Sequence, residues 1–290
     1  STPSNSSAAS DVYKRQGITA KWIWSIYAGI TCILVALLML GGMDWFDSVC
    51  HAFATTGTGG FSTKQASVAY YQSPYIEYVI SIFMFISGIN FTLLLFFVNR
   101  KFKKVIHDAE LKWYFWSVVL FTGLIAVILY YSNPIGMEDA FRKSLFQVIS
   151  LHTSTGFATD DYMLWPAVTW GLLTIVMLMG ACAGSTTGGL KCIRMVILGK
   201  VARNEFKHIL HPNAILPVRI NKQVISPSIQ STVLAFCFIY AVIIIISVLI
   251  MMGMGIGFVE SVGCVVSSIG NMGPGLGETG PAFSWNALPD

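Results

Sequence analysis

The sequence predicts an all-α polytopic membrane protein in which one unit repeats: a helix, a re-entrant helix, a glycine-centred loop and a second helix. Two observations predict this class. Hydrophobic residues make up 54% of the 290-residue chain and charged residues only 11%, whereas soluble domains contain about 25% charged residues. In addition, three small, polar, glycine-rich stretches interrupt the apolar chain, at 54–63, 151–157 and 267–273.

Each polar stretch follows a helix-like segment that begins with an acidic residue, and each lies beside predicted membrane spans. The clearest spans are Trp22–Leu40, Tyr75–Val98, Trp113–Tyr131, the run from Val168, and Ile229–Met252. Backbone without a helical partner is tolerated at membrane depth only where it is buried in protein or lines a water-filled cavity. We therefore expect the three stretches to form walls of one pore, as in a potassium-channel-like architecture of helix, pore helix, filter loop and helix.

Glycines identify the backbone most suited to binding a cation. Gly59, Gly156 and Gly270 recur at similar spacings when the three stretches are aligned on them. Glycine adopts unusual backbone conformations without a Cβ clash, and rings of backbone carbonyls can replace the hydration shell of an ion. The predicted cation-binding residues are Thr58, Gly59, Thr155, Gly156, Ile269, Gly270 and Asn271.

The chain before the first span differs from the rest. Residues 1–16 are polar and serine-rich, and the run Asp11–Gln16 matches the translation of a sequencing-adapter end. We expect 1–16 to be a non-native or disordered tail. The first repeated unit is then 17–110.

Basic residues predict the orientation of the first two units. Clusters at 100–104 and from Lys191 to Lys222 should be cytoplasmic, because loops rich in Lys and Arg remain inside. The three glycine loops would then lie on the outer side. Arg142 and Lys143 are exceptions to this rule, since they lie on a predicted outer pore helix.

Two polar segments within apolar runs have open interpretations. Residues 87–90, inside the second span, place the Asn90 amide near mid-membrane, where it either packs helices together or lines the pore. In the second unit, 111–222, an interruption separates the apolar run Val168–Ala181 from a helix that resumes at Leu190. Several glycines in one helix should unwind it, giving a gate loop below the filter or a packing kink. The residues of this interruption are Gly184, Ser185, Thr186, Thr187, Gly188 and Gly189.

Outer acidic residues complete the candidate features. Asp160, Asp161 and Glu278 either raise the local cation concentration or belong to ordinary solvated loops. The last unit, 223–290, is partial because no inner helix follows its glycine loop.

Five motifs resemble the Trk/Ktr/HKT superfamily of potassium transporters, and most closely its Trk-type membrane subunits. They are Gly-Gly-Phe-Ser-Thr at 59–63, Thr-Ser-Thr-Gly-Phe-Ala-Thr at 153–159, Gly-Asn-Met-Gly-Pro-Gly-Leu-Gly at 270–277, Gly-Ala-Cys-Ala-Gly-Ser-Thr-Thr-Gly-Gly-Leu-Lys at 180–191, and His-Pro-Asn-Ala at 211–214. The resemblance implies potassium as substrate, no covalently bound cofactor, and gating by 184–189.

The same resemblance implies a multi-pass protein of the bacterial cytoplasmic (inner) membrane that works as a homodimer. Each protomer would contain its own pore, and a cytoplasmic nucleotide-binding ring subunit would regulate it at the basic loops 99–112 and 191–222. The resemblance also implies a first filter wall and a final inner helix, so we expect a fragment truncated at both ends.

Other classes of function fit less well. A secondary transporter of another class also uses broken helices at a mid-membrane site. However, a carrier with inverted repeats should not place the same loop on the same side three times. The sequence contains no catalytic constellation at membrane depth, so we do not expect an enzyme. We also expect no nucleic-acid partner. The sequence does not indicate whether sodium or protons are coupled to transport, or which nucleotide regulates it.

Overall fold

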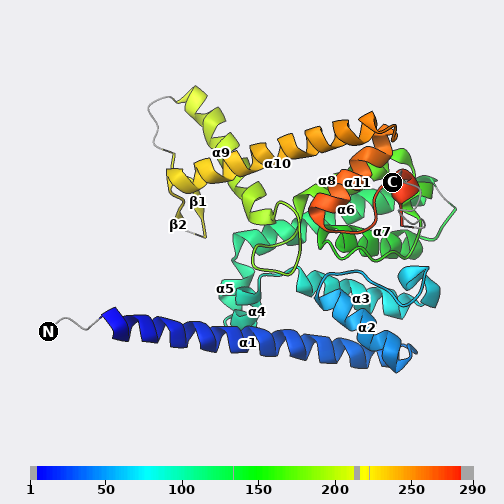
Figure 1. The fold of residues 1–290 in the computed structure, drawn as a ribbon, viewed down its shortest axis with the longest axis horizontal. Coiled ribbons are helices and arrows are strands. Elements are labelled where there is room, and N and C mark those ends of the chain that lie inside the picture. Colours follow the sequence, from blue (N-terminus) through cyan, green and yellow to red (C-terminus); the bar gives the residue numbers. More distant parts are fainter. Residues whose placement is uncertain (1–4, 133, 212–215, 222, 282–290) are drawn as a thin grey trace.

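The computed structural model describes residues 5–132, 134–211, 216–221 and 223–281, and these are mostly helical (Figure 1). Residues 212–214 of the His-Pro-Asn-Ala motif lie outside the described residues. The α-helices are α1 (Asn5–Leu40), α2 (Trp45–Thr56), α3 (Pro74–Ser87), α4 (Phe91–Val98), α5 (Phe102–Ile106), α6 (Ala109–Ser132), α7 (Met137–His152), α8 (Ala167–Met179), α9 (Cys192–Leu210), α10 (Pro227–Gly253) and α11 (Phe258–Gly270). Short 3₁₀ turns occur at Ser67–Tyr71, Tyr162–Leu164 and Gly277–Thr279.

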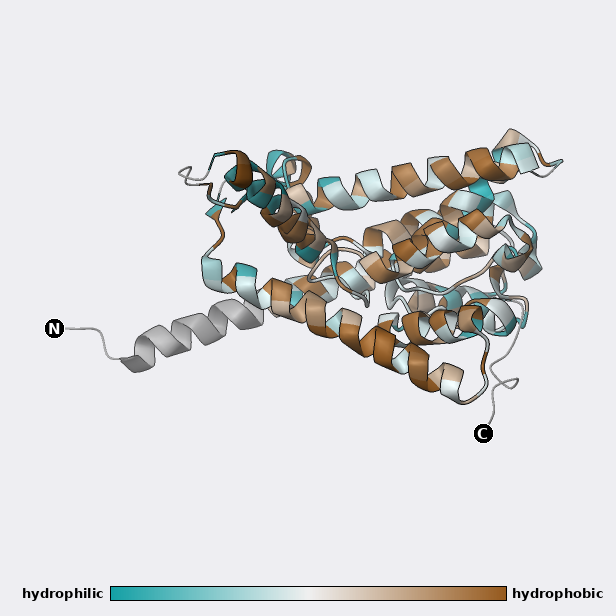
Figure 2. Cartoon of the chain, turned by 90° about the horizontal axis from the view of Figure 1, so that it is seen from above, coloured by the Kyte–Doolittle hydropathy of each residue, from teal (hydrophilic) through white to brown (hydrophobic). Residues whose placement is uncertain are grey.

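Among the residues that the structure describes, three helices are long and apolar enough to cross a membrane: Ala20–Leu40 within α1, all of α6, and all of α10. A fourth span is possible if the bent pair α3 and α4 crosses together. Figure 2 shows that hydrophobic residues are frequent along the coloured parts of the long helices. Along α10 only Val233 and Val248 are buried, so most of this helix is available to contact lipid. These helices confirm the predicted polytopic membrane class.

The predicted span Tyr75–Val98 is wrong as a single helix. It is divided into α3 and α4, which are bent by 103° at residues 88–90. The Asn90 side chain ends the break by accepting a hydrogen bond from the Thr92 amide at 2.8 Å, which caps α4. Asn90 therefore starts a new helix instead of interrupting a continuous one.

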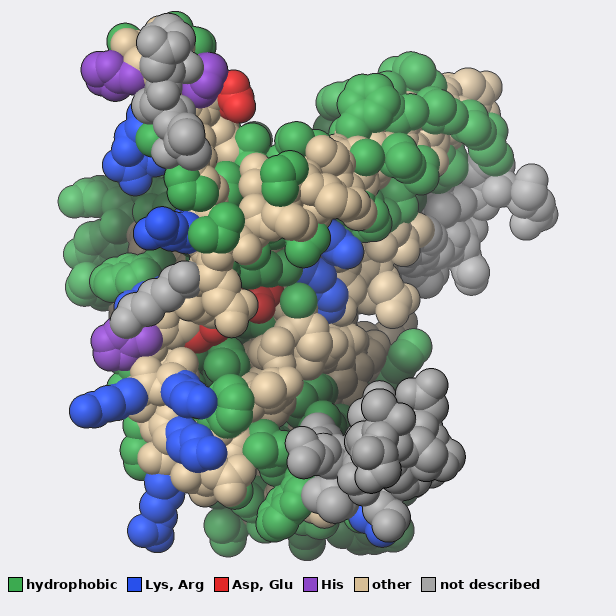
Figure 3. Space-filling model, turned by 90° about the vertical axis from the view of Figure 1, so that its left-hand side faces the viewer, with side chains coloured by type: hydrophobic (Ala, Val, Ile, Leu, Met, Phe, Trp, Pro, Cys, Tyr) green, Lys and Arg blue, Asp and Glu red, His purple; other side chains and the backbone are tan. Residues whose placement is uncertain are grey.

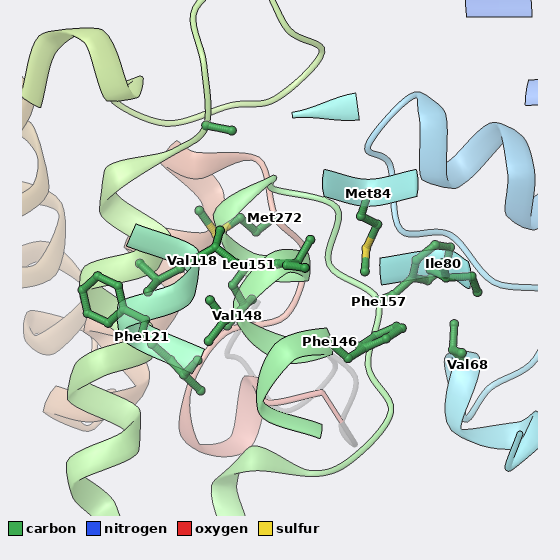
Figure 4. Packing of buried hydrophobic residues seen from close by; sticks show 14 of the residues in the cluster. Val68, Ile80, Met84, Val118, Phe121, Phe146, Val148, Leu151, Phe157 and Met272 are labelled. Carbon is green, nitrogen blue, oxygen red and sulfur yellow. The ribbon is translucent and has the colours of Figure 1, made fainter. Parts of the chain in front are cut away.

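Helices α2, α7 and α11 match the three predicted pore helices. Each contains an acidic residue in its first turn, namely Asp47 in α2, Glu138 and Asp139 in α7, and Glu260 in α11. Buried side chains of α3, α6 and α7 pack together at the centre of the core, including Met84, Val118 and Leu151 (Figure 4). This packing holds α7 against α3 of the first unit and against α6 of its own unit.

Basic side chains gather at one end of the molecule (Figure 3). This end includes exposed Lys103 and Lys104 of α5 and exposed Arg203 and Lys207 of α9. A small antiparallel hairpin also lies there, made of β1 (Arg219–Ile220) and β2 (Gln223–Val224), which the sequence did not predict. At the opposite end α1 finishes and α2 begins (Figure 1), as the predicted orientation requires.

The structure explains why Arg142 is tolerated on an outer pore helix. Its Nε lies 3.4 Å from Oε2 of Glu77 on α3 and 3.5 Å from Oε1 of Glu138, and its Nη2 contacts Asp139. The side chains of Arg142 and Glu77 are each only 10% exposed. Nearby, Lys143 pairs with Asp160 at 2.7 Å. Carboxylates therefore neutralise both cations.

Arg142→Ala should lower the free energy of unfolding by about 3 kcal/mol, because it leaves the buried Glu77 carboxylate without its partner. The combined change Arg142→Met with Glu77→Leu should recover most of that loss, since it removes both buried charges. Unfolding in mixed micelles measures the effect. Lys103→Ala, at an exposed position of α5, is the control; a loss at Arg142 no larger than the control's would contradict the assignment.

Candidate functional site

The backbone makes the same turn after each of the three re-entrant helices. In each turn one amide donates a hydrogen bond to a carbonyl within the last helical turns. The three bonds join Gly59 to Ala54 (2.7 Å), Thr155 to Ser150 (2.8 Å) and Met272 to Ser267 (3.0 Å). Left-handed residues flank each of these amides, as the pairs Thr58 and Gly60, Ser154 and Gly156, and Asn271 and Gly273.

This pattern corrects the alignment of the repeats. The structurally equivalent glycines are Gly60, Gly156 and Gly273, whose φ angles are 64°, 85° and 96°. The sequence alignment on Gly59 and Gly270 is therefore wrong in the first and third loops. Gly270 belongs to the last turn of α11. A glycine–phenylalanine pair at 60–61 and 156–157 was the signal that would have set the register of the first two loops.

Glycine is required in the first two loops because backbone approaches backbone there. A Cβ added at Gly60 would lie 1.8 Å from the carbonyl oxygen of Thr155, and one at Gly156 would lie 1.9 Å from that of Met272. Both distances are far below van der Waals contact. The loops therefore pack in chain order: a glycine of the first loop lies against a carbonyl of the second, and a glycine of the second lies against a carbonyl of the third.

A cleft of about 480 Å³ lies where the three loops meet. Of the predicted residues, Thr58, Gly59, Gly156 and Asn271 line it. The Thr155 carbonyl contacts Gly60 instead. Ile269 lies in a separate pocket of about 320 Å³ between α10 and α11. The structure thus brings four of the seven predicted residues to one cleft, together with Gly60, Met272 and Gly273, which were not among the predicted cation-binding residues.

The interruption at 184–189, here called the intramembrane loop, contacts all three walls. The Thr58 hydroxyl donates to the Thr186 carbonyl at 3.1 Å, and the Thr186 hydroxyl donates to the Thr56 carbonyl at 3.3 Å. The Gly188 amide donates to the Ser154 hydroxyl at 3.1 Å. A Cβ at Gly188 would lie only 2.1 Å from the Gly270 carbonyl oxygen. Gly270 therefore meets the intramembrane loop, although it does not line the cleft.

The conformation of this loop is set by glycines and by local polar contacts. Gly184 and Gly189 have φ angles of 72° and 75°. The Ser185 hydroxyl donates to the Cys182 carbonyl at 2.6 Å. The Lys191 ammonium donates to both the carbonyl and the hydroxyl of Thr187. Helices α8 and α9 are separated by residues 180–191, so the predicted unwinding of this segment is confirmed.

Side chains behind the loops join the walls together. His51 of α2 lies 2.9 Å from the Ser62 hydroxyl and stacks on Phe157 of the second loop, with ring centroids 5.6 Å apart. The Ala69 amide donates to the Ala158 carbonyl at 3.2 Å. The Tyr162 hydroxyl donates to the Gly275 carbonyl, which joins the second and third walls. Of these supporting residues, His51, Ala69 and Tyr162 lie outside the motifs singled out from the sequence.

Asp47, in the first turn of α2, holds the segment 63–71 that follows the first loop. It accepts hydrogen bonds from the Thr63 hydroxyl at 2.7 Å and the Tyr71 hydroxyl at 2.8 Å, and Lys64 lies 3.1 Å away. The hydrogen bond from Thr63 is the main cause that lowers the pKa of Asp47 to about 2. A lowered pKa stabilises the fold above the ordinary value of 3.8, and this contribution is lost as the pH falls toward 2.

Candidate membrane spans, three short helices that each end in an equivalent loop, and one cleft where these loops meet define a polytopic membrane fold of potassium-channel-like architecture. The TrkH family model, described as cation transport protein, matches residues 9–287. The chain belongs to this family, and the predicted superfamily is confirmed.

Individual relatives agree with this family. The chain is 35% identical to the Trk system potassium uptake protein TrkH of Escherichia coli K12 over 268 residues, which is 92% of this chain and 56% of that protein. It is 35% identical to TrkG of the same strain over 271 residues, or 91% and 55% of the two chains. The crystal structure of the potassium transporter TrkH from Vibrio parahaemolyticus superposes with a TM-score of 0.86 at 32% identity, covering 91% of this chain and 57% of that one. The chain thus spans just over half the length of these relatives.

Proposed function

We propose that this chain forms three walls of a potassium uptake pathway whose conduction is controlled by the intramembrane loop. The main support is the convergence of three equivalent glycine loops on one cleft. The relatives named as potassium uptake proteins support potassium as the transported ion. Potassium acts here as substrate and not as a resident cofactor.

Selection of the ion follows from carbonyl geometry. An ion that enters the cleft must exchange water for protein oxygens, and backbone carbonyls in turns with left-handed residues are suited to this. The C-terminal ends of α2, α7 and α11 lead into the loops, and the negative end of a helix dipole favours a cation. Each wall supplies one glycine of the equivalent set, so the ordered filter is short.

Control follows from the position of the intramembrane loop directly against the walls. Its contacts with Thr56, Thr58 and Ser154 are single hydrogen bonds, each contributing only about 1 kcal/mol. Such contacts can break without unfolding the spanning helices. This favours a gate over a packing kink.

The proposal extends to partners and location. We infer a multi-pass protein of the bacterial inner membrane, a homodimer, and regulation by a cytoplasmic nucleotide-binding ring subunit at the basic end. The exposed cations of α5 and α9 support a partner at this end. The alternative is a secondary transporter with a mid-membrane site. Such transporters are often built from inverted repeats, whereas this chain has three equivalent loops around one cleft, which favours the pore.

Gly60→Ser and Gly156→Ser should lower the preference for potassium over sodium, because an added Cβ would collide with the carbonyl of the neighbouring wall. The measurement is ion flux into liposomes that contain the protein encoded by the complete reading frame. Gly171→Ser is the matched control, since Gly171 lies on α8 outside the cleft and a Cβ there would meet nothing within 4 Å. Unchanged ion preference in both variants, with intact expression, would refute the filter assignment.

Deletion of Ser185–Gly188 should raise the rate of potassium flux without changing ion preference, because it removes the contacts with Thr58 and Ser154 but leaves the walls in place. The same liposome assay measures both quantities. Loss of flux in correctly inserted protein would show that the intramembrane loop is structural.

Neutralising Arg203 and Lys207 together should weaken binding of the ring subunit, because both are exposed on α9, which continues directly from the intramembrane loop. Charge contacts at a surface are screened beyond about 8–10 Å at physiological salt, so the difference should be largest at low salt. Pull-down across a salt series measures it, and the exchange Arg203→Lys with Lys207→Arg is the charge-preserving control. Equal binding at every salt concentration would leave membrane topology or lipid contact as the role of these cations.

A further inference from the structure

A buried carboxylate outside the cleft contacts both ends of the intramembrane loop. Glu110 lies in the first turn of α6 and is 7% exposed. Its Oε1 accepts hydrogen bonds from the Ala183 amide at 2.6 Å and the Ile193 amide at 3.2 Å. Ala183 immediately precedes the intramembrane loop, and Ile193 belongs to the first turn of α9 that follows it. One oxygen atom therefore connects the two ends of the interruption.

The chemistry of this contact favours a carboxylate. The first amides of a helix have no intrahelical acceptor, and the N-terminal end of the helix dipole attracts negative charge. Glu110 satisfies the Ile193 amide of α9 in this way. The Ala183 amide belongs to unwound backbone and needs an acceptor at membrane depth. Glu110, which lies on α6, is the acceptor for both amides.

The residues that precede Glu110 are bonded to the small hairpin β1–β2. Asn221, in the hairpin turn, accepts from the Ala109 amide at 2.8 Å, and its amide group donates to Asp108 at 2.7 Å. Asp108 also accepts from the Leu111 amide at 2.9 Å at the start of α6. The hairpin therefore holds the start of α6, which presents Glu110 to the loop.

The hairpin is attached to α9 as well. Ile220 packs against Val196 and Ile197, and Lys200 donates to the Arg219 carbonyl at 2.6 Å. A displacement of the hairpin would thus change the distance between the start of α6 and the start of α9. The distance between Glu110 and its two amides depends on that arrangement.

We propose that Glu110 is a positioning residue that holds both ends of the intramembrane loop, and that the hairpin β1–β2 transmits displacements of the basic end to this contact. The inference rests on the proposed function only where it concerns flux. The contact between Glu110 and the loop ends is a structural statement that can be tested separately.

Hydrogen exchange in the protein from the complete reading frame tests the contact itself. Glu110→Ala should make exchange of the Ala183 and Ile193 amides about ten-fold faster, the scale of losing a hydrogen bond to a charged acceptor. Glu110→Gln, which keeps the shape and a weaker acceptor, should give a smaller increase and guards against misfolding. Glu205→Gln, at an exposed position of α9, is the control. Exchange equal to wild type in both Glu110 variants would overturn the proposal.

Asn221→Gly tests the role of the hairpin. Asn221 has a φ of 47°, which glycine adopts without strain, so this change removes only the side-chain bonds to Asp108 and Ala109. Exchange at Ala183 and Ile193 should rise in the same direction as in Glu110→Ala, by a smaller factor. Unchanged exchange would overturn the transmission through the hairpin.

Potassium flux separates this inference from the proposed function. With the loop ends released, flux should rise several-fold at unchanged ion preference, since the cleft residues are untouched. Faster exchange with unchanged flux would support the positioning role of Glu110 and count against the intramembrane loop as a gate. Unchanged exchange would overturn the positioning role whatever the flux.

Discussion

The whole structure depends on satisfying backbone polar groups at membrane depth, where water is not available as a partner. The interrupted segments of this chain satisfy one another. The Cys182 amide donates to the Gly88 carbonyl, and the Phe91 amide donates to the Gly184 carbonyl, so the break between α3 and α4 is paired with the break between α8 and α9. The intramembrane loop then bonds to the first and second loops through Thr58 and Ser154. Each break therefore supplies hydrogen-bond partners for another.

The hydrogen bonds between these interrupted segments explain where glycine is needed. Backbone bonds to backbone across these segments only if the chains approach closely, and a side chain would prevent that approach. Gly60, Gly156 and Gly188 each face a carbonyl oxygen at a distance that a Cβ could not occupy. Gly59, by contrast, has only ordinary contacts. Two adjacent glycines therefore differ in their tolerance of substitution because of one neighbouring carbonyl.

The sequence predicted the features that depend on composition and local pattern, and missed those that depend on a distant partner. Apolar length was sufficient for α1, α6 and α10, and polar composition was sufficient for the three loops. The break at 88–90 was missed because a single Gly88 costs only about 1 kcal/mol in a helix, while its partner Cys182 is remote in sequence. The register of the loops was missed for a similar reason, since Gly59 and Gly60 differ only in what the second loop places against them. Arg142 is an exception to the rule that basic residues remain cytoplasmic, because the partner that neutralises it, Glu77, is remote in sequence.

The balance of energies favours a movable intramembrane loop. Its hydrogen bonds to Thr56, Thr58 and Ser154 together contribute roughly 3 kcal/mol if each contributes about 1 kcal/mol. Coupling free energies between a partner site and a distant site are typically about 1–3 kcal/mol, which is the scale that the proposed cytoplasmic partner would need to release the loop from the walls. The walls differ, because the buried side chains of α3, α6 and α7 pack around them and hold them in place. Weak polar contacts on the loop and dense apolar packing behind the walls therefore allow one to move while the other keeps its geometry.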